Sequence, residues 1–463
     1  MIRLLRQLIP ANVFALLVTE AALTATCFVL ASYVLLDVDP SVYLLYDGGW
    51  WRIGFIVVTV LAGFYLHDLY SNLRVTSRIL LLQQGLQVIG ITFLVQALLS
   101  YASPEWILPR WIMVLGGGFS LIALVNWRIF YGTFVMHAMT EVRVLFVGTN
   151  PLVREIVQHY NEHSELGFTV LGYLDEDGAG QNTLSGAARL GGIQDLLRVV
   201  DQTKPDRLVI GLLERRRQLP TPELLNLRLS GLRIDEAATA FEATFRRVSL
   251  SELRPAQLIF ASELGPGPGI VQLQSLYSVL LGLLGTALCA PLMLVVAVAV
   301  KLSSAGPVLY RQERVGLLGS TFVLYKFRSM YLDAEDRTGA VWAVRDDPRI
   351  TPLGRWLRRL RLDELPQFFN VLRGEMSIVG PRPERPEFVR TLAEQIPFYR
   401  QRHCIKPGIT GWAQINHKYG DTIEDSVRKL EFDLYYIKNL SLALDAYIIF
   451  HTGKTMLLSR GAQ

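Results

Sequence analysis

Residues 276–300 read LYSVLLGLLGTALCAPLMLVVAVAV, a run without a charged side chain. A helix needs roughly 20 apolar residues to cross a bilayer, so this run is long enough to do so. Pro291 interrupts it, because a proline removes one helical hydrogen bond and clashes with the turn before it. The flank after residue 300 is basic, which opposes export of the C-terminal part of the chain. Two interpretations stay open: a spanning helix that tolerates its proline, or a helix kinked near residues 288–290 that returns to the same side of the membrane.

Four more apolar stretches lie nearer the N-terminus, at about residues 9–36, 53–70, 79–99 and 111–134. The loops on one side of these stretches are basic and those on the other side are mostly acidic; the basic side carries Arg3, Arg6, Arg74 and Arg78. The positive-inside rule therefore predicts a cytoplasmic N-terminus. Four crossings return the chain to the cytoplasm near residue 137.

The next part of the chain reads as a small α/β domain. Residues 141–148 (EVRVLFVG) and 208–211 (LVIG) have the pattern of buried parallel strands, and helix-like segments alternate with them. This alternation predicts a Rossmann-like domain over residues 138–250. Asn150 and Val153 stand where a dinucleotide-binding fingerprint has glycines, which favours a structural or regulatory role over nucleotide binding.

The composition agrees with a membrane protein that has cytoplasmic domains. Of 463 residues, 51% are hydrophobic and 19% are charged, which argues against a disordered chain, a secreted disulfide scaffold and a fully soluble enzyme. The net charge of +5 suits anionic lipids, nucleic acid or phosphorylated substrates, and it does not choose among them. The three cysteines form no pair with metal-ligand spacing.

Two adjacent carboxylates, Asp363 and Glu364, are the first candidates for chemistry. They precede Pro366 and an apolar run, so a cap and a first-turn residue of a helix would also explain them. An excess of cations weakens that interpretation; these are Arg355, Arg358, Arg359, Arg361 and Arg373. Such an excess suits a phosphorylated anion, on which one carboxylate can attack phosphorus while the other holds Mg²⁺.

Three motifs around the carboxylates resemble a known family. They are YKFRSM (325–330), LDELPQFFNVLRGEMSIVGPRP (362–383) and KPGITGWAQ (406–414). The chain from about residue 270 resembles the catalytic domain of bacterial polyprenol-phosphate phosphoglycosyl transferases of the monotopic superfamily. The whole chain resembles the larger members, which initiate exopolysaccharide, capsule or O-antigen synthesis. The segment GPRPERPEF (380–388) is similar to the subgroup associated with PEP-CTERM/exosortase systems.

The resemblance implies a reaction and a role for each motif residue. Asp363 would attack the β-phosphate of a UDP-sugar and release UMP, and undecaprenyl phosphate would then take the sugar 1-phosphate. Glu364 would coordinate the cofactor Mg²⁺. Arg382 would bind the phosphates of the nucleotide sugar, and Lys326 and Arg328 are expected to contact substrate phosphate. The transferred group is expected to be a hexose 1-phosphate, from glucose or galactose.

The resemblance also implies the organisation of the chain. The fold expected is an integral membrane protein of α plus α/β class: four transmembrane helices (1–137), a Rossmann-like cytoplasmic domain (138–250), a linker (251–275), a re-entrant membrane helix hairpin broken at Pro291 (276–301) and an α-rich catalytic domain (302–463). The expected location is the bacterial inner membrane, with the soluble domains in the cytoplasm. The expected partners are the UDP-sugar, undecaprenyl phosphate, the lipid bilayer and a second copy of the chain in a homodimer, without nucleic acid. Ala290 replaces the serine that commonly precedes the family's helix-breaking proline.

Other functions find less support in the sequence. A membrane-anchored nucleotide-sugar dehydratase or epimerase needs a Tyr-x-x-x-Lys pair, which the chain lacks. Gly453-Lys-Thr455 mimics a phosphate-binding loop, but Ile448 stands where that loop needs glycine. A catalytically silent membrane scaffold or nucleotide-sugar sensor is the remaining alternative, and the presence of both Asp363 and Glu364 argues against it.

Overall fold

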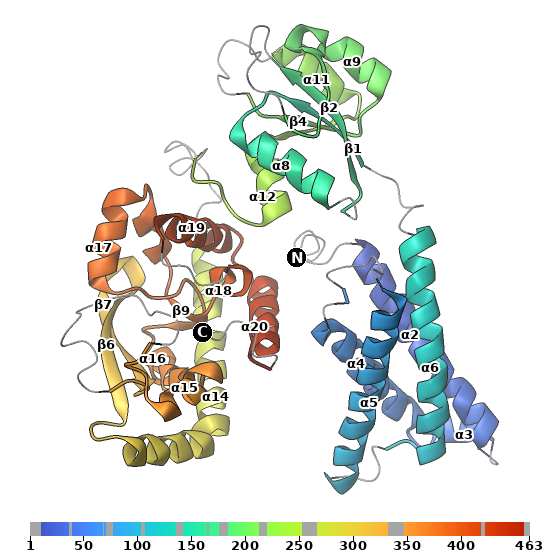
Figure 1. Cartoon of the computed structure of the whole chain (residues 1–463), viewed down its shortest axis with the longest axis vertical. Helices are drawn as coiled ribbons and strands as arrows, with labels where there is room; N and C mark the ends of the chain where they lie inside the picture. The colour runs from blue at the N-terminus through green and yellow to red at the C-terminus, as the bar shows by residue number, and fades with distance from the viewer. Residues whose placement is uncertain are drawn as a thin grey trace. The chain divides into compact units, whose positions relative to one another are not determined.

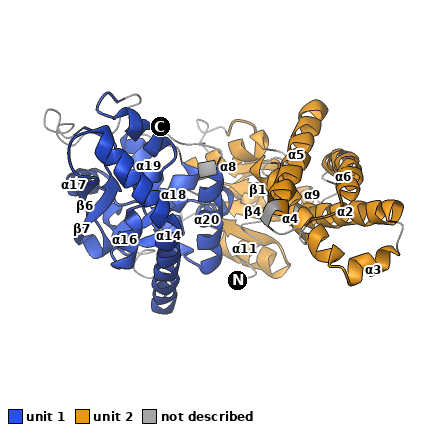
Figure 2. Cartoon of the chain, turned by 90° about the horizontal axis from the view of Figure 1, so that it is seen from below, with its two compact units in different colours: residues 1, 237–463 blue, residues 2–236 orange. Residues whose placement is uncertain are grey.

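The computed structural model describes residues 11–36, 39–67, 69–70, 77–102, 107–135, 142–163, 166–175, 184–212, 220–251, 266–331, 347–417 and 422–457. The chain divides into two compact units, residues 2–236 and residues 237–463 (Figure 2).

Four long apolar helices begin the first unit; they are α2 (Ala11–Leu35), α4 (Gly49–Leu66), α5 (Arg78–Ala102) and α6 (Arg110–Phe130). The short α3 (Pro40–Leu45) connects α2 to α4, and a π-helical turn, η2 (Tyr131–Val135), extends α6. Helix α2 packs on α4 and α6, and α5 packs on the same two helices. All four are long and apolar enough to cross a membrane, as the hydrophobic stretches predicted.

A charged cluster is buried among these helices. Arg128 Nε lies 2.6 Å from Glu20 Oε1, and the hydroxyl of Tyr70 donates to Glu20 Oε2 at 2.6 Å. Arg128 Nη1 also donates to the Leu69 carbonyl at 2.9 Å. Breaking a buried ion pair is costly, so these contacts join α2, α6 and the residues that follow α4.

The rest of the first unit is a five-stranded parallel sheet in the order β3-β2-β1-β4-β5. Its strands are β1 (Val142–Val147), β2 (Phe168–Asp175), β3 (Arg189–Gly192), β4 (Arg207–Ile210) and β5 (Arg233–Glu236). The connecting helices are α8 (Pro151–Glu162), α9 (Leu196–Thr203) and α11 (Thr221–Leu229), with a 3-10 turn η4 (Ile193–Asp195) before α9. Buried Leu145, Leu174 and Leu208 form part of its core. The predicted parallel α/β sheet is confirmed.

The turn between β1 and α8 explains why the glycine fingerprint is missing. Asn150 is buried and caps α8, because its Oδ1 accepts a hydrogen bond from the Val153 amide at 2.9 Å. A Cβ at Gly148 would lie 2.3 Å from the Gly211 carbonyl oxygen, so the ends of β1 and β4 approach each other closely. Asn150 therefore has a structural role in this turn.

The second unit is built around one long helix, α14 (Pro268–Ser303), and two small sheets (Figure 1). The sheets are the antiparallel pair β6 (Leu309–Val315) and β7 (Thr321–Phe327) and the parallel pair β8 (Ser377–Val379) and β9 (Gly408–Thr410). The other helices are α12 (Ala237–Phe245), α15 (Pro352–Arg359), α16 (Gln367–Leu372), α17 (Pro386–Gln395), α18 (Trp412–Asn416), α19 (Ile423–Lys438) and α20 (Leu442–Leu457). Among the described residues of this unit there are also short turns of 3-10 helix: η5 (Leu317–Gly319), η6 (Leu362–Glu364) and η7 (Tyr399–His403).

The first part of α14 is anchored by polar contacts. Gln274 Nε2 donates to the Val379 carbonyl at 3.2 Å and to Asp445 Oδ2 at 2.9 Å. The hydroxyl of Tyr277 donates to the same carboxylate, and Ser278 Oγ accepts from the Ile378 amide at 3.3 Å. These contacts fasten the first turns of α14 to β8 and α20.

The last part of α14 packs on the same unit through apolar side chains. Met293, Val296 and Val300 are buried with Phe327 of β7 and Leu357 of α15. In Figure 1 the pale green first part of α14 and its yellow last part run in different directions. Pro291 lies in the interior of this helix and gives a physical cause for the change of direction.

Two predicted boundaries differ from the structure. Residues 268–275, which the sequence assigned to a linker over 251–275, form the first turns of α14, because Pro268 begins the helix and Gln274 is buried in hydrogen bonds. The predicted Rossmann-like domain ended at residue 250, whereas α12 belongs to the second unit. Several contacts join this segment to α18 and α19, among them the buried ion pair between Arg247 and Glu431 at 2.7 Å and the ion pair between Glu242 and Lys438 at 2.9 Å.

Candidate active site

Asp363 and Glu364 lie on the 3-10 turn η6, between α15 and α16. The turn follows Arg361, whose backbone is left-handed with φ of 52°. Leu362 and Leu365, on either side of the carboxylates, pack against the apolar cluster that contains the end of α14. Neither carboxylate caps α16, so the alternative of a cap and a first-turn residue does not describe them.

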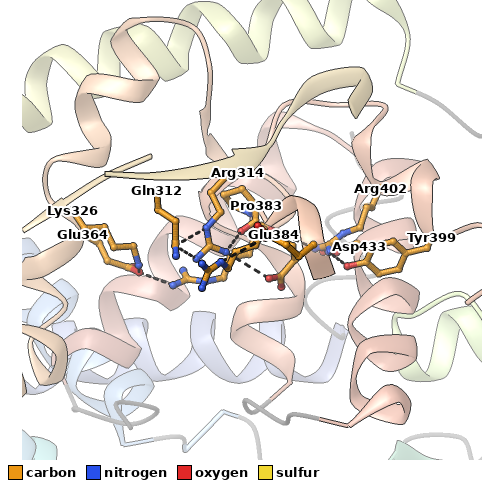
Figure 3. A network of polar contacts seen from close by, with 12 residues as sticks. Gln312, Arg314, Lys326, Glu364, Pro383, Glu384, Tyr399, Arg402 and Asp433 are labelled. Carbon is orange, nitrogen blue, oxygen red and sulfur yellow. Dashed lines mark hydrogen bonds and ion pairs between the residues drawn. The ribbon is translucent and has the colours of Figure 1, made fainter. Parts of the chain in front are cut away.

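Glu364 is held by cations from two other segments (Figure 3). Its Oε1 accepts from Lys326 Nζ at 2.8 Å and from Arg382 Nη2 at 2.6 Å. Arg361 Nη1 lies 3.9 Å from Oε2. Burial opposes the charge of Glu364, but Arg382 and Lys326 outweigh it, so the pKa of Glu364 lies well below its ordinary value. Glu364 is therefore a fixed anion.

Asp363 has a different environment. It is buried, with 7% of its surface exposed. Across the described residues no hydrogen bond to its carboxylate is found, in contrast to the two that Glu364 accepts. Burial raises the pKa of Asp363 above its ordinary value. The negative charge of Glu364 raises this pKa further, whereas the positive charges of Lys326 and Arg358 oppose the shift. The Asp363 carboxylate lies beside Glu364, whose charge the cations neutralise. A carboxylate in this position can form a bond to an incoming electrophile.

Lys326 and Arg328 are two residues apart and have different surroundings. Lys326, on β7, contacts Glu364; burial lowers its pKa and Glu364 opposes the shift. Arg328 lies just after β7 at the end of α14, where its Nη2 donates to the Ser304 carbonyl at 2.7 Å and to the Val300 carbonyl at 3.3 Å. It satisfies carbonyls that the helix leaves open. A contact of Arg328 with substrate stays a prediction.

Arg382 belongs to the loop Pro381-Arg382-Pro383 after β8, and other arginines hold the backbone of this loop. Arg402 Nη2, from η7, donates to the Arg382 carbonyl at 3.0 Å. Arg314 Nη1, from β6, donates to the Pro383 carbonyl at 2.9 Å. Sequence reasoning did not single out Arg314 or Arg402, because each lies outside the motif whose carbonyl it binds.

The carboxylates can also be tested as ligands of Mg²⁺. Among the described residues, no group of three or more His, Cys, Asp or Glu side chains could enclose a metal ion. Mg²⁺ is commonly bound by one or two carboxylates, with substrate phosphates and water completing six ligands. Glu364, the expected ligand, fits this second kind of site through Oε2, because the hydrogen bonds from Lys326 and Arg382 both go to Oε1.

Two family descriptions match the chain. The bacterial sugar transferase family matches residues 271–459, which include every motif residue of the site, and a CoA-binding domain matches residues 61–217.

Several curated relatives are enzymes by name. A UDP-N-acetylgalactosamine-undecaprenyl-phosphate N-acetylgalactosaminephosphotransferase of Aeromonas hydrophila is 46% identical over 47% of this chain and 50% of its own length. An undecaprenyl-phosphate glucose phosphotransferase of Komagataeibacter xylinus is 51% identical over 37% of this chain and 34% of its own length. The chain thus spans half or less of the length of these two relatives.

A third relative matches along most of both chains. A UDP-glucose:undecaprenyl-phosphate glucose-1-phosphate transferase of Xanthomonas campestris pv. campestris is 34% identical over 73% of this chain and 72% of its own length. This long match, together with the family match across the site, confirms the resemblance seen in the sequence: the chain belongs to the bacterial sugar transferases of the polyprenol-phosphate phosphoglycosyl transferase family.

Proposed function

We propose that this protein transfers a sugar 1-phosphate from a UDP-sugar to undecaprenyl phosphate and releases UMP. The observation that carries the proposal is the pairing of Asp363, whose carboxylate has no hydrogen-bond partner among the described residues, with Glu364, which two cations hold. The names of the relatives support the same reaction class. The proposed reaction has two steps at one phosphorus atom.

In the first step, a carboxylate oxygen of Asp363 attacks the phosphorus that bears the sugar. The bond from this phosphorus to the oxygen that bridges the two phosphates breaks, and its electron pair leaves with UMP. In the second step, a phosphate oxygen of undecaprenyl phosphate attacks the same phosphorus. The bond to Asp363 breaks, so the carboxylate is restored and undecaprenyl diphosphate sugar is formed.

The neighbouring residues supply charge and orientation to these steps. Arg382 and Lys326 bring positive charge to the place where phosphate oxygens gather in the transition state. Glu364 keeps both cations in place. Mg²⁺, when bound by Glu364, would neutralise charge on the diphosphate.

Glucose 1-phosphate is the sugar that the relatives favour. The relatives that match along more than 70% of their length, from Xanthomonas campestris and Klebsiella pneumoniae, are named glucose-1-phosphate transferases. The Aeromonas relative, which is named for N-acetylgalactosamine, matches over half its length. A panel of UDP-glucose, UDP-galactose and UDP-N-acetylgalactosamine tests this choice.

The arrangement of α14 supports a re-entrant position in the membrane. A straight helix of 36 residues would be about 54 Å long, more than a bilayer core of roughly 30 Å. Its first part contacts Val379 and Asp445, and its last part packs on Phe327 and Leu357 of the same unit. A crossing would place these partners on opposite sides of the membrane. We therefore infer that α14 dips into the cytoplasmic leaflet and returns.

The activity is tested with full-length protein in nanodiscs, radiolabelled UDP-sugar, Mg²⁺ and undecaprenyl phosphate. The wild type is expected to release UMP and to label the lipid, and Asp363→Asn to do neither. Glu387→Gln, at an exposed carboxylate of α17, is the matched control and keeps both activities. Release of UDP would indicate glycosyl transfer and would overturn the two-step proposal. Retained fold with no turnover of any UDP-sugar would favour the scaffold or sensor alternative.

The orientation is tested by cysteine labelling in intact bacteria, in a background without the native cysteines. Leu318, in the turn between β6 and β7, is 81% exposed, and Tyr46, between α3 and α4, is 82% exposed. With the proposed topology, Leu318→Cys stays unlabelled by an impermeant reagent and Tyr46→Cys is labelled. Labelling at residue 318 would place the second unit outside the cell. The homodimer and the PEP-CTERM subgroup stay predictions.

A further inference from the structure

The guanidinium of Arg402 connects three segments of the second unit that are far apart in the sequence. It donates to the Tyr399 hydroxyl at 2.7 Å and to the Arg382 carbonyl at 3.0 Å, and it lies 2.8 Å from Asp433 Oδ2 (Figure 3). Arg402 and Asp433 are 5% and 1% exposed. A buried ion pair of this kind contributes little net stability, so stability alone does not explain why the pair lies next to the site.

The pair of Arg402 and Asp433 lies beside the loop that carries Arg382. The loop carrying Arg382 has a proline on each side, and the carbonyls of Arg382 and Pro383 are bound by Arg402 and Arg314. Two fixed backbone angles and two bound carbonyls leave the loop little freedom. The side chain of Arg382 then reaches Glu364 at 2.6 Å. Arg402 itself makes no contact with Asp363 or Glu364 in the described part of the chain, so its effect on the reaction is indirect, and its hydrogen bond to the Arg382 carbonyl offers the route.

We propose that Asp433 and Arg402 are positioning residues: Asp433 holds Arg402, and Arg402 holds the loop so that Arg382 meets both Glu364 and the substrate phosphate. The expected effect on catalysis rests on the proposed function. The expected effect on the loop that carries Arg382 rests only on the contacts of Arg402 with that loop and with Asp433. A residue that supports the position of a catalytic or binding group typically changes activity by about 10- to 100-fold when it is replaced.

The same helix provides a matched control. Glu431, two residues before Asp433 on α19, makes a similar buried ion pair with Arg247 at 2.7 Å. That pair holds the segment after α12, where the Leu250 amide also donates to Glu431 Oε1 at 3.2 Å. Asp433→Asn and Glu431→Gln each remove the charge of one carboxylate from a buried pair. The first pair holds a carbonyl of the Arg382 loop, whereas the second holds a different segment.

The kinetic test measures single-turnover UMP release by the full chain in nanodiscs. Asp433→Asn and Arg402→Gln are expected to slow it about 10- to 100-fold, whereas Glu431→Gln leaves the rate near that of the wild type. In an Arg382→Gln background, Asp433→Asn should have no further effect, because the group through which it acts is gone. Equal slowing by Glu431→Gln, or an additive effect in the double variant, would overturn the positioning role.

The second measurement does not depend on activity. The amides of Val315 and Gly408 donate to loop carbonyls, those of Glu384 at 2.9 Å and Pro381 at 3.0 Å. Their hydrogen exchange is expected to rise about 10-fold in Asp433→Asn and to stay unchanged in Glu431→Gln. Unchanged exchange in Asp433→Asn would overturn the inference whatever the kinetics. If the wild type turns over no UDP-sugar while loop exchange rises as expected, the proposed function fails and the positioning of the loop stands.

Discussion

Two carboxylates of the second unit, the largely buried Glu364 and the fully buried Asp445, differ in the charge of their partners. Glu364 accepts hydrogen bonds from Lys326 and Arg382. Asp445 accepts from three neutral donors in the described residues, the amide of Gln274 and the hydroxyls of Tyr277 and Tyr436. Burial acts in the same direction on both. It raises the pKa of Asp445, but at Glu364 the two cations outweigh it and the pKa is lowered.

The difference indicates which of the two is a site for an anion. A lysine has three donors and an arginine five, more than one carboxylate can accept, so the cations around Glu364 can bind further anions. The three donors at Asp445 converge on one carboxylate and join α14, α19 and α20. Burial of a carboxylate alone thus does not distinguish chemistry from anchoring, whereas the charge of its partners does.

The largest effect is expected at the cation-rich site. Asp363→Asn removes the proposed nucleophile and should lower UMP release by roughly 10³-fold or more, with the thermal midpoint nearly unchanged. Asp445→Asn, which keeps its shape and an acceptor oxygen, should keep most of the activity. UMP release and a thermal unfolding curve from the same preparation measure both quantities. Equal loss of activity in the two variants would remove the distinction between the sites.

Replacing Asp445, which anchors α14, by alanine should reduce stability more than either asparagine substitution does. Asp445→Ala removes the acceptor that Gln274, Tyr277 and Tyr436 share. Gln274 and Tyr436 still have the Val379 carbonyl, so the expected cost is about 2 kcal/mol of unfolding free energy. Glu424→Ala, at an exposed carboxylate of α19, serves as the control and should change stability little. Thermal unfolding in nanodiscs, followed by circular dichroism, compares them. A stable Asp445→Ala variant would mean that the contacts to α14 are dispensable.

A smaller change tests one hydrogen bond to Asp445, the one from the hydroxyl of Tyr277. Tyr277→Phe removes the hydroxyl that donates to Asp445 while keeping the ring, and it should lower stability by about 1 kcal/mol. Tyr331→Phe, at a tyrosine that is 47% exposed, is the control. The thermal midpoints of both variants are compared with that of the wild type. A loss as large in Tyr331→Phe would show that the effect does not come from the anchor.

Much of the site could be predicted because its residues lie in contiguous motifs. The structure brings together Asp363, Glu364, Lys326 and Arg382, as the sequence predicted. Arg328 was assigned the same expected role as Lys326, but β7 ends between them, at Phe327, and Arg328 binds the end of α14. Spacing of two residues predicts a shared face only while the strand continues.

The supporting contacts could not be predicted, since they join distant segments. Asp433 and Arg402 are 31 residues apart, and nothing in either segment indicates the other. The same holds for the boundary at residue 236, where contacts such as the pairing of Arg247 with Glu431 join distant segments. The apolar stretches were predictable because length and hydrophobicity are local properties. The first part of α14 depends on partners more than 100 residues beyond Gln274. The last part depends on partners about 25 to 55 residues beyond the end of the helix. Periodicity reveals neither set of partners.

The smallest expected effect is a pH-dependent difference in thermal midpoint between Asp445→Asn and the wild type, and its direction can be predicted. Because burial raises the pKa of Asp445 in the folded protein, the folded state holds this proton more firmly than the unfolded chain, whose aspartates titrate near pH 4. The stability that this group contributes is therefore complete below about pH 4 and is lost as pH rises through the folded-state pKa. Asp445→Asn cannot titrate, so its thermal midpoint should rise relative to that of the wild type between pH 4 and pH 8. A constant difference would mean that burial does not govern this carboxylate. A difference of opposite sign would reveal a cation beside Asp445, and the contrast with Glu364 would then be wrong.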